Sequence, residues 1–100
     1  MSDLIVSVSH RLSQEEALRR IRATVAQAKT QYSDKIDDLS ESWNGYTGGF
    51  QISAQNQQVS GMVLVNPTDV TVQITLPFVA SFFKPMIESG MRAELTRIFE

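Results

Sequence analysis

The sequence predicts one α+β domain over residues 1–100, with an antiparallel sheet of about five strands, two helices on one face of that sheet and the element order β-α-β-β-β-β-α. Two periodicities carry this prediction. Five segments read as strands, most of them with apolar residues at every second position, and two segments have the three-to-four-residue spacing of amphipathic helices. Short connections between the strands favour an antiparallel sheet. One hundred residues are enough for one hydrophobic core and too few for two.

The first elements are a strand and a long helix. Alternation in segment 4–8 turns Leu4, Val6 and Val8 toward the core. Ser13 and Glu16 then have the S-x-x-E spacing of a capping box, in which each side chain bonds the backbone N–H of the other residue. A helix is expected from about Gln14 to Gln31. Its apolar stripe is Leu18, Ile21, Val25, Ala28 and Tyr32.

Four strands separated by turns follow. Leu39 to Trp43 ends at Asn44-Gly45, a strong turn dipeptide, and Gly48 and Gly49 are expected to loosen this hairpin further. A polar turn at 56–58 separates the strand 50–54 from the strand 59–65, and these two are expected to pair antiparallel. Another turn at 66–69 precedes the alternating segment 70–76.

The chain closes with an amphipathic helix. Proline suits the first position of a helix, which has no backbone hydrogen bond to lose, so the helix is expected to begin near Pro85. Residues 78–84 should then form a separate turn or a kinked first segment. Helical spacing gives most of the aromatic and methionine residues of this region a core role.

Composition and charge restrict the function. The chain has 42% hydrophobic and 20% charged residues, no cysteine and a net charge of -2, so disulfides, thiolate chemistry and a global attraction to nucleic acid are not expected. No apolar run approaches the ~20 residues of a membrane span, and segment 1–7 lacks the basic and apolar parts of a signal peptide. We expect a cytoplasmic protein without a membrane span.

The sequence contains no catalytic or metal-binding motif. His10 has no acidic neighbour, so a structural or capping role is favoured over general-base or ligand chemistry. Asp34, Asp37 and Asp38 do not follow the spacing of a calcium loop. On the first helix, Glu15 lies four positions before Arg19 and Glu16 four positions before Arg20, which favours ion pairs within the helix. Arg22 lacks an obvious acidic partner nearby in the sequence. We predict no enzyme activity, no cofactor and no metal.

Three apolar residues are left without a core role. Ile5, Met62 and Leu64 fall on the face of the sheet opposite the alternating core positions. An apolar patch there would suit a homodimer contact or an apolar ligand.

Several segments together resemble one family. They are the run Val6-Ser7-Val8-Ser9-His10-Arg11-Leu12-Ser13-Gln14-Glu15-Glu16-Ala17, the helix ending near Tyr32, Trp43, Val59-Ser60-Gly61, Leu76-Pro77-Phe78 and the closing helix. In these the sequence resembles the polyhydroxyalkanoic acid system proteins over nearly its whole length. That family consists of small bacterial proteins named for genes near those of polyhydroxyalkanoate granules. The resemblance implies no catalytic residues.

Two functions remain open. The first, implied by the resemblance, is a non-enzymatic accessory protein of polyester storage that binds a granule surface, a granule-associated protein or a second copy of itself, and is then located at storage granules. The second is a small binder of an apolar or acyl ligand, held between the sheet and the C-terminal helix with Trp43 or Tyr46 near the mouth. Gly61 would relieve crowding on the inner face. The candidate binding or interface residues are His10, Arg22, Trp43, Tyr46, Ile5, Met62 and Leu64.

Overall fold

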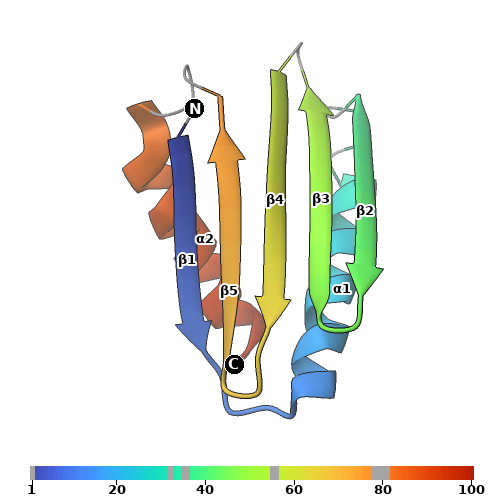
Figure 1. Cartoon of the computed structure of the whole chain (residues 1–100), viewed down its shortest axis with the longest axis vertical. Helices are drawn as coiled ribbons and strands as arrows, with labels where there is room; N and C mark the ends of the chain where they lie inside the picture. Colours follow the sequence, from blue (N-terminus) through green and yellow to red (C-terminus); the bar gives the residue numbers. More distant parts are fainter. Residues whose placement is uncertain (1, 32, 35–36, 55–56, 78–81) are drawn as a thin grey trace.

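The order of elements in the computed structural model agrees with the α+β prediction. The structure describes residues 2–31, 33–34, 37–54, 57–77 and 82–100. Within these residues one antiparallel sheet has the strand order β1-β5-β4-β3-β2 (Figure 1). The elements are β1 (Ser2–Ser9), α1 (Gln14–Gln31), β2 (Asp38–Asn44), β3 (Thr47–Ala54), β4 (Gln57–Val65), β5 (Asp69–Leu76) and α2 (Lys84–Ile98). The predicted fold class and element order are therefore confirmed.

The strands β1 and β5 pair although they come from opposite ends of the chain. Val6 lies opposite Val72, and Val8 lies opposite Val70. Because side chains alternate between the faces of a strand, this register places the valines of both strands on the same inner face. The apolar alternation of β1 and that of β5 thus bury the same face of the sheet.

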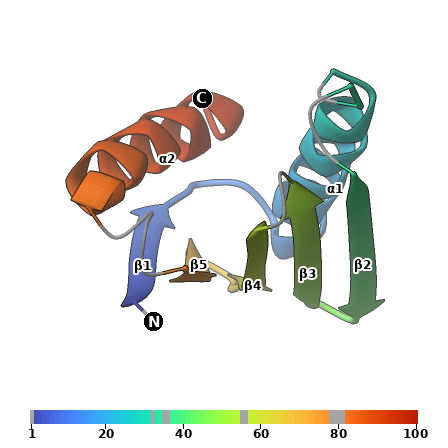
Figure 2. The same ribbon diagram turned by 90° about the horizontal axis from the view of Figure 1, so that it is seen from above.

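Both helices lie on the inner face, and the sheet curves around them (Figure 2). α2 packs on β1, whereas α1 lies toward β3 and β2 and contacts β4. The predicted placement of α1 and α2 on one face is confirmed. The helices touch each other only weakly, so the middle of the concave face lies between them.

The start of α1 follows half of the predicted capping box. The Ser13 hydroxyl accepts the backbone N–H of Glu16 at 3.1 Å, as expected. The Glu16 carboxylate does not reach back. It accepts from Arg19 at 2.6 Å and from Arg20 at 2.8 Å, because charged guanidinium donors form stronger hydrogen bonds with a carboxylate than a neutral N–H does.

The start of α2 agrees with the proline rule. The helix begins at Lys84, and Pro85 occupies its first turn, where a missing N–H costs nothing. The separate turn predicted for residues 78–84 falls partly on residues 78–81, which lie outside the described residues. Phe82 and Phe83 form a short 3₁₀ turn directly before the helix. The core role expected from helical spacing is wrong for Phe82, Phe83 and Met86, which are exposed because they lie at the start of α2, beyond the buried contacts of the helix.

The β2–β3 hairpin turns where predicted, but its glycines differ from the prediction. Gly45, in the turn after Asn44, has φ of 62°, a conformation that favours glycine. Gly48 and Gly49 do not loosen the hairpin, because both belong to β3. Gly48 lies opposite Trp43, and a Cβ at Gly48 would come within 2.8 Å of the indole ring. The ring therefore packs on the bare backbone of the neighbouring strand.

The strand β4 begins earlier than predicted. Gln57 and Gln58 pair with Ala54 and Ser53 of β3, so they belong to the ladder and not to a turn. Backbone pairing needs no apolar side chain, which is why the polar residues could be misread as a turn. Residue 56 of that predicted turn lies outside the described residues.

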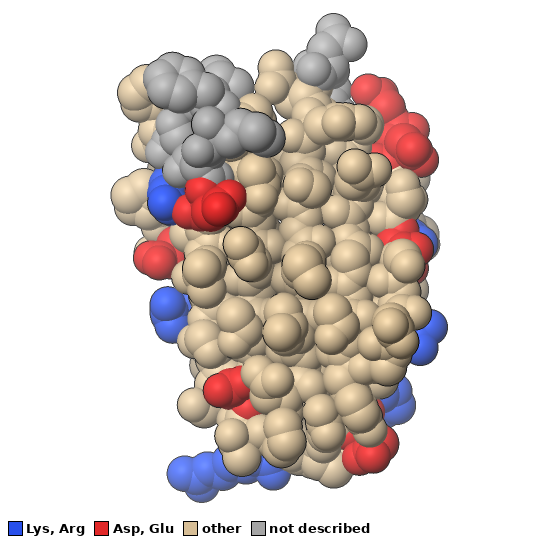
Figure 3. Space-filling view, in the orientation of Figure 1, with Lys and Arg blue, Asp and Glu red and all other residues tan. Residues whose placement is uncertain are grey.

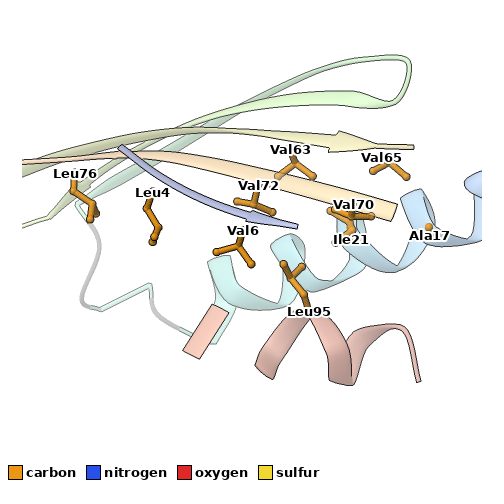
Figure 4. Packing of buried hydrophobic residues seen from close by; sticks show 10 residues of the cluster. All are labelled: Leu4, Val6, Ala17, Ile21, Val63, Val65, Val70, Val72, Leu76 and Leu95. Atoms are coloured by element: carbon orange, nitrogen blue, oxygen red, sulfur yellow. The ribbon is translucent and has the colours of Figure 1, made fainter. Parts of the chain in front are cut away.

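The hydrophobic core lies on the β1–β5–β4 side of the sheet (Figure 4). Most of its buried residues come from β1, β4 and β5, with two from α1 and one from α2. They are Leu4, Val6, Ala17, Ile21, Val63, Val65, Val70, Val72, Leu76 and Leu95. None of them comes from β2 or β3. On the β2–β3 side of the concave face, apolar residues such as Trp43 and Phe50 are only partly buried. This incomplete packing leaves room for a cleft.

Candidate functional site

An apolar cleft opens on the concave face of the sheet between α1 and α2. Its volume is about 380 Å³, within the range of about 300–1,000 Å³ typical of small-molecule pockets. Val25 and Ala28 of α1 form one wall, and Met91 and Leu95 of α2 form the other. The floor comes from three neighbouring strands through Phe50, Ile52, Val59, Val63, Val72 and Ile74. The surroundings are almost entirely apolar.

Gly61 lies in the floor of the cleft, where its missing side chain leaves space. It lies between Phe50 of β3 and Ile74 of β5 in the strand register. A Cβ at this position would come within 2.9 Å of the carbonyl oxygen of Gln73, so only glycine fits the close approach of the two strands. The strand pattern predicts that Gly61 relieves crowding on the inner face, and Gly61 does line the cleft.

Among the described residues, two charged side chains line the cleft, and both are paired. The Lys29 ammonium on α1 lies 2.7 Å from Glu41 Oε1 on β2. Glu94 on α2 forms an ion pair with Arg97 on the same helix. The hydrogen bond from Lys29, followed by one from the Trp43 indole at 2.9 Å, lowers the pKa of the Glu41 carboxyl. Both oxygens of Glu41 therefore accept a donor from the protein.

A second, polar pocket adjoins the cleft. Its volume is about 210 Å³, and it shares Lys29 and Leu39 with the apolar cleft. Its other walls are Ser33, Asp37 and Asp38. The two spaces therefore share part of their walls, at Lys29 of α1 and Leu39 of β2.

His10 directly follows β1, is not among the residues that line the cleft, and is 7% exposed. Its Nδ1 accepts the backbone N–H of Leu12 at 3.2 Å, which leaves Nε2 to donate to the carbonyl of Asn66 at 2.9 Å. The ring also packs against Phe99, with centroids 5.4 Å apart. These contacts connect the β1–α1 link, the β4–β5 turn and the end of α2.

Arg22 and Trp43 form one cluster beside the cleft. The Arg22 guanidinium lies over the indole at 5.6 Å, a cation–π contact that the sequence did not indicate. Trp43 meets Phe50 edge to face, with centroids 5.7 Å apart, and Phe50 lines the cleft. Trp43 itself does not line the cleft, so it touches this space through one intervening ring.

Tyr46 lies in the β2–β3 turn and is not among the residues that line the cleft. Its hydroxyl donates to Glu15 Oε1 at 2.9 Å, and this bond raises the pKa of Tyr46 and lowers that of Glu15. Glu15 thus bonds the hairpin and not Arg19, the partner expected from helical spacing. Spacing within a helix cannot indicate a partner from a distant turn.

Ile5, Met62 and Leu64 are exposed on the outer face of the sheet, as expected from their alternation. Their exposed fractions are 58%, 46% and 36%. In the view of Figure 3 the centre of this face has few charges, and Lys, Arg, Asp and Glu residues gather near its margin. The homodimer contact through this face stays a prediction.

The walls of the cleft were not identified from the sequence. Two features of the sequence could have indicated the cleft: inward-facing positions on β3 and β4 that the core does not need, and the small residues Ala28 and Gly61. Neither feature indicates a cleft until the spacing between α1 and α2 is known. Among the described residues no group of three or more His, Asp or Glu side chains could hold a metal ion. In the described part of the chain no helix is long and apolar enough to cross a membrane.

Comparison with known proteins gives one family match. The family model described as "Putative polyhydroxyalkanoic acid system protein" matches residues 4–99. No curated protein matches the chain. The crystal structure of TTHA0849 from Thermus thermophilus is similar at a TM-score of 0.46 and 12% sequence identity, over 98% of this chain and 94% of that chain. The family match includes every residue that lines the apolar cleft.

Proposed function

Because the chain belongs to the polyhydroxyalkanoic acid system protein family, we propose that it is a non-enzymatic accessory protein of polyhydroxyalkanoate storage that binds a hydroxyalkanoate chain in the cleft between α1 and α2. The observation that carries this proposal is the apolar cavity of about 380 Å³. Hydroxyalkanoate units combine an aliphatic chain with polar ester or hydroxyl oxygens, and the adjoining polar pocket has donors and acceptors for such oxygens.

The aliphatic lining supports a ligand of this kind. Each methylene removed from water contributes about 0.8 kcal/mol, so affinity should rise up to about fourfold per added methylene. The rise should stop once the chain fills the cleft. A binder of this kind leaves its ligand chemically unchanged.

Titration of methyl 3-hydroxyalkanoates of increasing chain length tests the proposal. Trp43 is the only tryptophan of the sequence and packs on Phe50 of the cleft floor, so its fluorescence should report occupancy. We expect saturable binding that strengthens with chain length, and recovery of the intact ester afterwards. No binding at any chain length by fluorescence and calorimetry would contradict the proposal.

Two alanines of α1 give a matched pair of variants. Ala28 lines the cleft, whereas Ala26 is exposed on the same helix and does not. Ala28→Phe should place a ring in the cleft and weaken ester binding by about tenfold or more, while the fold tolerates a ring that fills empty space. Ala26→Phe should bind like the wild type. Equal binding by both variants would place the ligand elsewhere.

A second candidate function is attachment to the granule surface through the start of α2. Phe83 and Met86 are 55% and 71% exposed, and an apolar polyester surface would cover them. The double variant Phe83→Ser/Met86→Ser should lose co-sedimentation with isolated granules. Ile5→Ser/Leu64→Ser, which changes two exposed apolar residues of the outer face that do not line the cleft, should retain it. A wild-type protein that stays in the supernatant would exclude attachment.

A further inference from the structure

The charges around the cleft restrict the ligand further. Of the described residues that line it, Lys29 is the only basic one, and its ammonium already pairs with Glu41 at 2.7 Å. Glu94, the acidic residue of the lining, pairs with Arg97. Arg22 is exposed and lies over Trp43, outside the lining. A ligand in the cleft therefore meets no unpaired positive charge among these residues.

Binding of an anionic ligand in the cleft would carry a large desolvation free energy. A carboxylate buried among aliphatic side chains requires a compensating cation, because desolvation of an unpaired charge costs several kcal/mol. Lys29 could compensate it only by leaving Glu41. Glu41 would then lose its ammonium partner next to the incoming negative charge, and Asp37 and Asp38 of the adjoining pocket add to the repulsion.

We infer that the cleft selects the neutral ester form of a hydroxyalkanoate chain over the free hydroxyalkanoate anion, and that Glu41 sets this preference by holding Lys29 away from the ligand. The inference rests on the proposed function and adds the ligand class to it. A polyester segment or an esterified acyl chain is neutral along its whole length, so it needs no counter-charge. Glu41 acts as a positioning residue, since it reaches the ligand only through Lys29.

Glu41→Gln separates the positioning role from a structural one. Glutamine keeps the size of the side chain, and its amide oxygen can still accept the Trp43 indole N–H. The ammonium of Lys29 would then face a neutral amide and become available to a ligand carboxylate. The variant should therefore gain affinity for the acid while its affinity for the ester stays unchanged.

Calorimetric titration of methyl 3-hydroxydecanoate and 3-hydroxydecanoate at pH 8 tests the inference. The wild type should bind the ester at least about tenfold more tightly. Glu41→Gln should reduce this ratio about tenfold through stronger acid binding, and Lys29→Met in the same chain should abolish that gain. Thermal unfolding of each variant verifies that it is folded.

The possible failures are distinguishable. A wild type that binds neither ligand overturns the proposed function itself. A wild type that binds the ester but binds the acid equally well or better overturns only the inference on ligand class. An ester-to-acid ratio that Glu41→Gln leaves unchanged overturns the role of Glu41.

Discussion

At the scale of single residues, His10 is a structural centre and not a reactive group. Both ring nitrogens are engaged, with the Leu12 backbone N–H on one side and the Asn66 carbonyl on the other, and this pattern matches the tautomer that has its hydrogen on Nε2. Buried polar groups contribute little when paired and cost much when a partner is removed. The His10 side chain therefore stabilises the fold mainly because its removal would leave two backbone groups without a hydrogen-bond partner.

Replacement of His10 should therefore destabilise the protein. His10→Ala leaves the Leu12 N–H and the Asn66 carbonyl unpaired and opens a void against Phe99, which together should cost about 2–4 kcal/mol in the free energy of unfolding. Urea denaturation measures this change. Arg11→Ala, at the exposed neighbouring position, should alter stability little. A loss for His10→Ala below about 1 kcal/mol would show that the ring is dispensable.

Glu16 gives stability a pH dependence. Hydrogen bonds from Arg19 and then Arg20 lower its pKa from 4.5 to about 2 in the folded chain. Because the folded pKa is depressed, the contribution is fully present above pH 4.5 and is lost as the pH falls toward 2. Glu16→Gln should therefore be less stable than the wild type near neutral pH, and the difference should vanish near pH 2. A difference independent of pH, measured by denaturation at several pH values, would contradict this.

Local partners could be predicted from the sequence and distant ones could not. The Ser13 cap was found because it involves residues three apart in the chain. The bonds of Tyr46 to Glu15 and of Lys29 to Glu41 join different elements, and no periodicity indicates such pairs. The same holds for Arg22, whose partner is an aromatic ring on another element.

At the scale of elements, the β2–β3 hairpin depends on the packing of a large side chain, Trp43, against a glycine, Gly48. The Trp43 ring occupies the space above Gly48, directly across the strand pair. This contact also fixes the ring against Phe50, and so orients the part of the hairpin nearest the cleft. The sequence predicted the hairpin from Asn44-Gly45, but it read Gly48 and Gly49 as a sign of looseness.

The two adjacent glycines therefore make a controlled comparison. Gly48→Ala forces a methyl group to within 2.8 Å of the indole, so it should lower the free energy of unfolding by about 1–3 kcal/mol. Trp43 fluorescence should shift as the ring moves. Gly49→Ala meets nothing within 4 Å and should be neutral or slightly stabilising. Similar stabilities for both variants in urea denaturation would disprove the close packing.

At the scale of the whole molecule, the fold follows from patterns along the chain and the cleft does not. Helix α1 was predicted from Gln14 to Gln31 because the capping signal and the apolar stripe agree, and these are its bounds in the structure. The cleft depends on the curvature of the sheet and on the distance between α1 and α2, which arise from packing of elements far apart in the sequence. Inward residues such as Phe50 and Ile74 look like core residues until that gap is seen.

The most direct test of the central claim is NMR observation of contacts between bound methyl 3-hydroxydecanoate and the methyl groups of the protein. We predict intermolecular contacts from the alkyl chain to Val25, Ile74 and Leu95, which lie on the two walls and the floor of the cleft. Contacts only to Ile5 and Leu64 on the outer face, or no contacts at saturating ligand, would contradict binding in the cleft.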